Sequence, residues 1–211
     1  MKIVASLLAI ALISGCAGEP YIVLNTDTPP SANYRVIDKP FYDVWERSVQ
    51  KLGKQSFVID NLDESSGLIN ITYSGDPEKF IDCGNITSYV NDKQGKHTYD
   101  FPGAKAEATY EIVNGGVLFY VDRKMSVEAR TGLVFKVINP HQVKVTANTL
   151  YLVQKVVTAK RKDNNFTQRW SDSISFSTRG ASSFRNDFNS AASTVCKPNG
   201  ELERELLSAI E

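Results

Sequence analysis

Apolar and polar residues alternate along most of residues 106–176, and this period-two pattern constrains the fold more than any other feature of the chain. The turn signals Asn114-Gly115-Gly116 and Asn139-Pro140-His141 separate neighbouring runs. We expect strands at 106–113, 117–130, 133–138, 143–157 and 166–176. Short connections favour antiparallel pairing, and an apolar residue at every second position gives a sheet one buried face. The pattern therefore predicts a curved antiparallel meander.

Residues 34–73 add a helix to this sheet. Residues 41–52 are predicted to form a helix, because the residues of its expected inner face recur at three- and four-residue spacing. These residues are Phe41, Val44, Trp45, Ser48, Val49 and Leu52. Pro40 suits the first turn of this helix, and Gly53 suits its end. Strands are expected at 34–37, 56–60 and 67–73, with a turn at 61–66 that makes the last two antiparallel.

The remaining segments are less regular. Residues 74–103 contain several turn-forming residues and are interpreted as a long excursion with a short strand at 86–90. Phe184 and Phe188 are candidates for a helical segment. A C-terminal helix over residues 201–210 is predicted by apolar residues at helical spacing, which are Leu202, Leu206, Leu207 and Ile210. The predicted class is α+β, with one principal amphipathic helix on the sheet, a short C-terminal helix, and a single domain over residues 34–211.

The first fifteen residues are typical of a signal peptide. Lys2 is followed by an apolar run over residues 3–13, which at 11 residues is shorter than the roughly 20 needed to span a bilayer. The run ends in Ile13-Ser14-Gly15-Cys16, which resembles the lipobox of bacterial lipoproteins. That resemblance implies cleavage before Cys16 and attachment of lipid, including palmitate-type acyl chains, to its sulfur. The alternative is an ordinary signal peptide with a cysteine close to its cleavage site.

Residues 16–33 are expected to form a flexible tether, because they lack periodicity and contain Gly18, Pro20, Pro29 and Pro30. Ala17 follows the cysteine, and the absence of aspartate there is typical of lipoproteins released to the outer membrane. We therefore expect a lipid-anchored outer-membrane protein whose domain faces the periplasm.

Charge and cysteine content agree with that compartment. The chain has 24 basic and 24 acidic residues, so it lacks the basic surplus typical of nucleic-acid-binding proteins. Besides Cys16 it contains only Cys83 and Cys196. In an oxidising periplasm such a pair favours a disulfide, which would fasten the C-terminal segment to the body of the protein. Two unpaired thiols are the alternative.

The unit over residues 34–73 is similar to the repeated unit of the BamC-type lipoproteins, which belong to the outer-membrane β-barrel assembly machinery. There, too, a helix containing Val-Trp leads into a strand, an acidic turn and a glycine-led strand. The matching positions are Val44, Trp45, Leu52, Phe57, Ile59, Asp63 and Gly67. The resemblance implies a helix-grip type of α+β domain on an acylated tether. It covers about forty of the 211 residues, and no second copy of the unit follows Ser74, so it implies fold type and compartment but not membership of that complex.

No catalytic motif is present in the sequence. It contains no Gly-x-Ser-x-Gly elbow and no phosphate-binding loop. His97 and His141 have no partners at metal-ligand spacing, so neither metal nor cofactor is expected. We expect a non-enzymatic binding or scaffolding component of an envelope assembly, with envelope proteins as partners.

The alternative function is a periplasmic carrier of lipid or another apolar ligand. A groove between helix and curved sheet would then be lined by Trp45, Phe166, Trp170 and Phe176. The competing interpretation of these aromatic residues is an ordinary hydrophobic core, in which the helix fills the groove.

Overall fold

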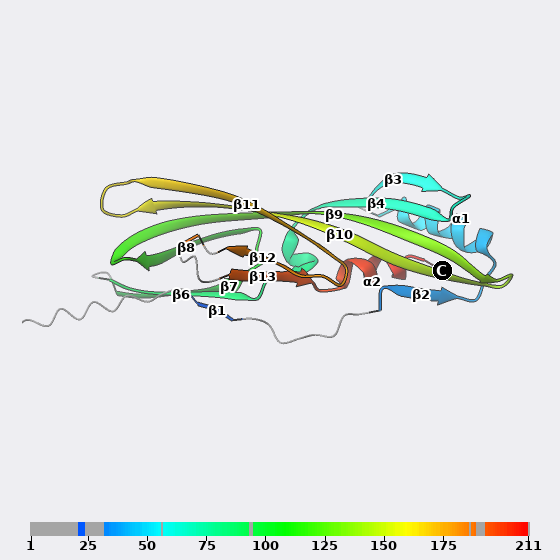
Figure 1. Cartoon of the computed structure of the whole chain (residues 1–211), viewed down its shortest axis with the longest axis horizontal. Coiled ribbons are helices and arrows are strands. Elements are labelled where there is room, and N and C mark those ends of the chain that lie inside the picture. Colours follow the sequence, from blue (N-terminus) through cyan, green and yellow to red (C-terminus); the bar gives the residue numbers. More distant parts are fainter. Residues whose placement is uncertain are drawn as a thin grey trace, which may run out of the picture.

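Two long strands run the length of the molecule and organise the rest of it (Figure 1). The computed structural model describes residues 21–23, 32–55, 57–92, 95–185, 187–188 and 193–210. The predicted signal peptide and Cys16 lie outside the described residues. The long strands are β9 (Val117–Asn139) and β10 (Gln142–Arg161), which pair antiparallel from Phe119–Arg161 to Asn139–Gln142. At about 3.3 Å per residue, β9 extends about 75 Å.

Shorter strands extend the sheet at both edges of this central pair. The outer edge of β9 pairs with β8 (Glu107–Asn114) towards one end and with β4 (Leu68–Gly75) towards the other. The outer edge of β10 likewise pairs with β11 (Thr167–Ser177) and β2 (Tyr34–Ile37), and β3 (Val58–Asp63) adds to β4. All these pairings are antiparallel, and the sheet is open, as the alternating pattern predicts.

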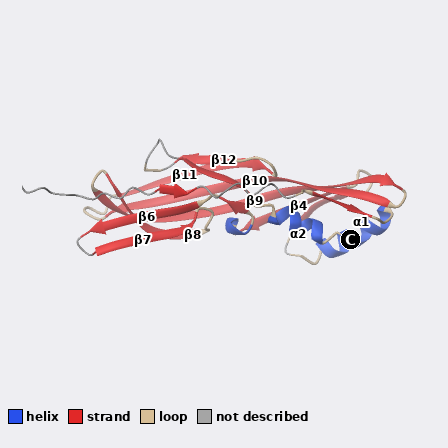
Figure 2. Cartoon of the chain, turned by 90° about the horizontal axis from the view of Figure 1, so that it is seen from below, coloured by secondary structure: helices blue, strands red, loops and turns tan. Residues whose placement is uncertain are grey.

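Both α-helices among the described residues lie in one half of the molecule and cover the same face of the sheet (Figure 2). Helix α1 (Phe41–Leu52) begins after Pro40 and buries Val44, Trp45, Ser48 and Leu52. Helix α2 (Glu201–Ser208) buries Leu202, Glu203, Leu206 and Leu207. The buried Glu203 carboxylate is satisfied by Tyr151 of β10, whose hydroxyl oxygen lies 3.0 Å from each carboxylate oxygen.

Two smaller sheets complete the described part of the fold. Strands β1 (Tyr21–Val23), β6 (Asn85–Asp92) and β7 (Gly95–Pro102) form a separate antiparallel sheet. A small third sheet holds β12 (Ser182–Arg185), β13 (Ser193–Pro198) and β5 (Ile81–Asp82), and the 3₁₀ helix η1 (Pro77–Lys79) precedes β5. Cys83, directly after β5, is disulfide-bonded to Cys196 of β13, which confirms the expected bridge.

The buried apolar residues form two clusters. The larger lies between the sheet and the two helices and includes Val44, Leu52, Leu133 and Val145. The smaller lies at the helix-free end, where Ile86 and Phe101 of the β6–β7 hairpin pack with Ile112, Val121 and Val157 of the main sheet. Because β9 and β10 contribute to both clusters, they make one continuous body.

Several expectations require correction. The excursion over 74–103 contains the eight-residue strands β6 and β7 as well as η1 and β5. The expected break between residues 130 and 133 does not exist, because β9 is continuous through Gly132. Phe184 lies in strand β12 and not in a helix, and β3 continues through Asp63 into the expected turn.

The range expected to form the tether also contains ordered residues. Strand β1 lies within it, and Asn33 at its end is buried. The Asn33 amide donates to the Ala147 carbonyl at 3.0 Å, and its oxygen accepts from Arg179 at 3.0 Å. The folded body therefore includes residues before Tyr34.

Candidate protein-binding groove

A surface groove follows the outer side of helix α1. It consists of two adjoining hollows of about 490 and 400 Å³ that share Tyr42 and Glu64. The hollows are lined by Phe41, Tyr42, Trp45, Glu46, Val49, Gln50, Glu64, Ser65, Ser66, Gly67, Phe135 and Val137. We call this set the α1 groove.

Aromatic packing between the helix and β9 forms the floor of the groove. The Trp45 ring stacks on Phe41 with 5.8 Å between centroids and meets the edge of Phe135 at 5.2 Å. These contacts fix the rings, and Trp45 is only 7% exposed. Tyr42 is 71% exposed and Val137 is 53% exposed, so both present apolar surface at the groove.

The wall opposite α1 is the turn between β3 and β4. Gly67 ends this turn with φ +63°, and a Cβ atom there would lie 2.6 Å from the Phe135 carbonyl oxygen. Glycine permits this close approach, in which the Phe135 amide donates to the Gly67 carbonyl at 2.8 Å. This contact holds the turn against β9, so that the turn forms the wall of the groove opposite α1.

The rim of the groove is acidic. Glu46 of α1 and Glu64 of the β3–β4 turn are its charged lining residues, and both are exposed. No lysine or arginine is among the lining residues. The groove thus combines an aromatic floor with a negative rim, which suits a segment that carries both aliphatic and basic side chains.

The inner side of α1, in contrast, is filled. Val44, Ser48 and Leu52 have no exposed surface, and the Ser48 hydroxyl donates to the Val44 carbonyl at 2.6 Å. Side chains therefore occupy the space between this helix and the sheet, as the core interpretation of Trp45 expects.

The four aromatic residues predicted to line one apolar groove do not come together. Trp45 and Phe176 belong to the larger core cluster, Phe176 stacked on Tyr151. Trp170 packs against Phe188 beside the smaller cluster. Phe166 is 52% exposed at the turn between β10 and β11. Alternation along β11 places Trp170 and Phe176 on one face but does not reveal that they pack in different clusters, about 20 Å apart along the strand.

No direct signal in the sequence pointed to most of the groove. Tyr42 falls on the outward side of the helix, Glu46 had no predicted role, and Glu64 was expected only as part of the solvated turn over residues 61–66. Val137 continues the inward alternation of β9 beyond the region that α1 covers. Val137 is therefore an apolar residue on the inward face of β9 that no predicted helix covers. This is the one feature of the sequence that could have indicated the α1 groove.

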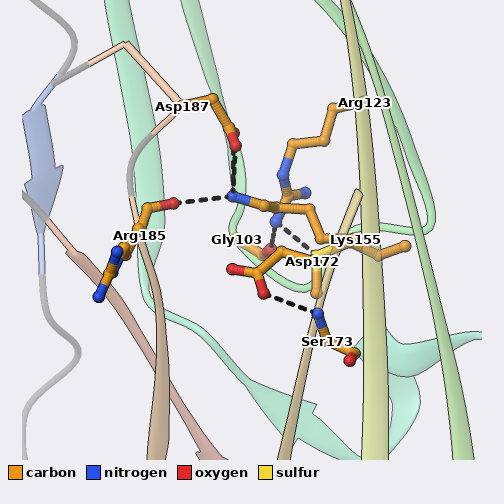
Figure 3. A network of polar contacts seen from close by, with 8 residues as sticks. Gly103, Arg123, Lys155, Asp172, Ser173, Arg185 and Asp187 are labelled. Atoms are coloured by element: carbon orange, nitrogen blue, oxygen red, sulfur yellow. Dashed lines mark hydrogen bonds and ion pairs between the residues drawn. The ribbon is translucent and has the colours of Figure 1, made fainter. Parts of the chain in front are cut away.

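Lys155 and Arg123 take part in a network of buried polar contacts (Figure 3). The Lys155 ammonium donates to the Arg185 carbonyl at 2.9 Å and pairs with the Asp187 carboxylate at 2.9 Å. The Arg123 guanidinium donates to the carbonyls of Gly103 and Lys105. Each cation is only 3–5% exposed.

These buried cations are already satisfied by protein groups. Burial lowers the pKa of Arg123 below its usual value, and burial raises the pKa of the neighbouring Tyr110 to about 12. The carbonyl groups and the carboxylate that receive hydrogen bonds all come from the chain itself, so the arrangement explains how two cations can be buried. We interpret the network as structural.

The histidines occupy unrelated positions. His97 lies 2.8 Å from the buried carboxylate of Glu111, and the backbone amide of His141 donates to Asn139 in the β9–β10 turn. No group of three potential metal-ligating side chains occurs among the described residues. Within the same residues, no helix has the length and apolar character required to cross a membrane.

Comparisons with protein-family models, with curated proteins and with solved structures found no match for this chain.

Proposed function

We propose that this protein is a non-enzymatic lipoprotein of the bacterial outer membrane, anchored through Cys16, with its domain in the periplasm. The signal-peptide pattern and the lipobox-like Ile13-Ser14-Gly15-Cys16 support export and acylation. The Cys83–Cys196 disulfide agrees with an oxidising compartment. Its task in this proposal is to bind or scaffold an envelope assembly.

The observation that carries the binding role is the α1 groove with its exposed Tyr42. Ordered aromatic rings on a rigid helix give contact area with little loss of conformational entropy. The occupant we propose is a segment of an envelope protein that carries aliphatic side chains and at least one lysine or arginine. The lipid anchor would hold this protein near envelope proteins at the same membrane and so raise its local concentration there. Moderate affinity then suffices for binding.

The helix-grip resemblance is part of the same proposal. In the half of the molecule that contains α1, the helix is followed by the β3–β4 hairpin, and the larger core cluster holds Trp45 together with residues of β4, β9 and β10. This order agrees with the repeated unit of the assembly-machinery lipoprotein. We propose a helix-grip type of module for this half alone, joined through β9 and β10 to the β-rich half.

Site-specific photocrosslinking in the native host tests the binding role. A photoreactive phenylalanine analogue replaces Tyr42 in the full chain, and the matched control carries it in place of Leu150. Leu150 is also strongly exposed but alternates with the buried Tyr151, so it faces away from the helices. We expect a discrete crosslinked protein from position 42 and none from position 150.

The same experiment separates the two candidate functions. Identical products from both positions, or no protein adduct from position 42, would contradict a docking groove. Native mass spectrometry of the purified protein would detect a co-purifying lipid if the protein were instead a carrier of an apolar ligand.

A further inference from the structure

Three hairpin ends meet at the end of the molecule far from helix α1 (Figure 1). They are the turns of β6–β7, β8–β9 and β10–β11. Lys162, in the β10–β11 turn, pairs with Asp92 at the end of β6 at 2.9 Å, and its backbone amide donates to the Leu118 carbonyl of β9 at 3.0 Å. These contacts join the three hairpins into one surface, which we call the hairpin end.

The β10–β11 turn presents an aromatic side chain on an ordered backbone. The Arg161 amide donates to the Phe166 carbonyl at 2.8 Å, and the Phe166 amide donates to the Asn164 side chain at 3.0 Å. Asn165 adopts the left-handed conformation, φ 59°, which asparagine tolerates better than most residues. The turn is thus held closed while the Phe166 ring remains half exposed.

The hairpin end is basic, although the whole chain is neutral. Among the described residues of 90–97, 109–122 and 158–169, the exposed or partly exposed charges are five cations and three carboxylates, a net charge of +2. The cations are Lys96, Lys160, Arg161, Lys162 and Arg169. Tyr120, paired with Lys160 across β9 and β10, is also substantially exposed. Basic side chains beside exposed aromatic rings are typical of surfaces that contact anionic bilayers.

The pairing of β1 with β6 places Tyr21 relative to the hairpin end. Tyr21 pairs with Thr87 and Val23 with Asn85, so β1 runs antiparallel to β6. Strand β6 runs towards the hairpin end, so Tyr21 is the residue of β1 nearest to that end. Cys16 precedes Tyr21 by five residues, which can span at most about 18 Å. Asp92, at the hairpin end, lies five residues beyond Thr87, the partner of Tyr21, which is about 16 Å along β6. The reach of the chain from Tyr21 to Cys16 is therefore similar to the distance from Tyr21 to the hairpin end.

We infer that the hairpin end rests on the anionic phospholipid surface of the membrane that holds the Cys16 lipid, with Phe166 and the surrounding basic side chains in contact with headgroups. This inference rests on the proposed acylation of Cys16. The short reach from Tyr21 holds the hairpin end close to the bilayer, and the positive charge and the exposed rings match its surface.

This orientation places the α1 groove away from the membrane. Phe135, in the floor of the groove, lies 17 positions along β9 from Leu118 at the hairpin end. That separation corresponds to about 55 Å along the strand. The molecule would thus act as a spacer that presents the groove deep in the periplasm.

Photocrosslinking to lipid tests the orientation in the full chain in its host membrane. The photoreactive phenylalanine analogue p-benzoylphenylalanine replaces Phe166 in one variant and the similarly exposed Val137 in the control. Mass spectrometry of the purified protein then measures phospholipid adducts. We expect adducts at position 166 and none above background at position 137.

Charge reversal adds a second readout. Lys160→Glu with Arg169→Glu, introduced into the position-166 variant, is expected to lower the adduct yield by about fivefold or more, while Lys136→Glu, at the other end of β9, leaves it unchanged. Equal yields from positions 166 and 137, or no effect of the double reversal, would overturn the inference.

Acylation of Cys16, measured on the same samples, separates the two proposals. An acylated protein without adducts at position 166 would refute the orientation and leave the anchor intact. Adducts at position 166 on a protein whose Cys16 carries no lipid would support the membrane contact and refute the anchor. A protein that shows no lipid on Cys16 and no adducts at position 166 would refute both the anchor and the orientation.

Discussion

The sulfur atoms of Cys83 and Cys196 form a disulfide between residues 113 positions apart, and both side chains are fully buried. The bond fixes β13, and through it helix α2, to the segment that begins the β6–β7 hairpin. It therefore closes just over half of the 211-residue chain into one covalent loop.

Loss of this disulfide should weaken the fold substantially. The chain-entropy model gives about 4–5 kcal/mol for a loop of this length, an upper range because real disulfides often contribute less. We expect Cys83→Ala with Cys196→Ala to lower the free energy of unfolding in urea by several kcal/mol. Reductant should destabilise the unaltered protein similarly and leave the double variant unchanged. Insensitivity of the unaltered protein to reductant would contradict this expectation.

Alkaline pH should destabilise the protein through its buried tyrosines. Burial raises the pKa of Tyr110 from 10.0 to about 12, and burial also raises the pKa of Tyr99 and of Tyr151. Because the folded pKa exceeds the unfolded one, the stabilisation is complete below about pH 10 and is lost as the pH rises towards 12. Within that window Tyr110 contributes a slope of up to about 1.4 kcal/mol per pH unit.

The variant Tyr110→Phe isolates one of these contributions. Urea unfolding at several pH values above about 9 should show a shallower decline for Tyr110→Phe than for the unaltered protein. The same slope in both proteins would mean that Tyr110 titrates normally in the folded state.

The buried network should be far more sensitive to substitution than a surface ion pair. Lys155→Met leaves the Asp187 carboxylate and the Arg185 carbonyl without their donor, and breaking such a buried pair costs about 3 kcal/mol. The matched variant is Lys124→Met, whose partner Glu107 is exposed, so about 1 kcal/mol or less is expected. Comparable losses in thermal or urea unfolding would show that the network does not stabilise the fold.

Reversing the acidic rim should abolish partner binding without unfolding the protein. Glu46→Lys with Glu64→Lys gives the α1 groove the same sign of charge as the segment that we propose it binds. We expect the position-42 crosslink to be lost while the free energy of unfolding changes by no more than about 1 kcal/mol, because both side chains are exposed. Reversal of Asp43 and Glu78, exposed acids outside the groove lining, is the control; retention of the crosslink after rim reversal would rule out a basic partner segment.

Local patterns predicted much of this fold. The helix over residues 41–52 was predictable because its apolar spacing, its preceding proline and its following glycine all agree. The β8–β9 hairpin was predictable because Gly115 and Gly116 both supply the positive φ that a two-residue turn requires. The disulfide was predictable because Cys83 and Cys196 are the two cysteines besides Cys16 and the leader predicts export to an oxidising compartment.

Other features depended on tertiary contacts that the pattern cannot show. Thr131 and Gly132 interrupt the apolar alternation of β9, yet Thr131 faces inward and forms a buried hydroxyl pair with Thr149 at 2.9 Å. Ser88 likewise occupies an inward position of β6, where it donates to the Glu111 carbonyl at 2.6 Å. A polar residue at that position interrupts the apolar alternation, and only the shorter strand over 86–90 was predicted there. The α1 groove combines a helix, a turn and β9 across about ninety positions of sequence, so no local signal specified it.

Acylation of Cys16 is the central claim, and metabolic labelling tests it most directly. Cells that express the full chain are grown with an alkyne-tagged palmitate, and the purified protein is compared with its Cys16→Ser variant. We predict a labelled protein that fractionates with the outer membrane, and an unlabelled variant that does not. A mature protein with no fatty acid on Cys16 would contradict the account.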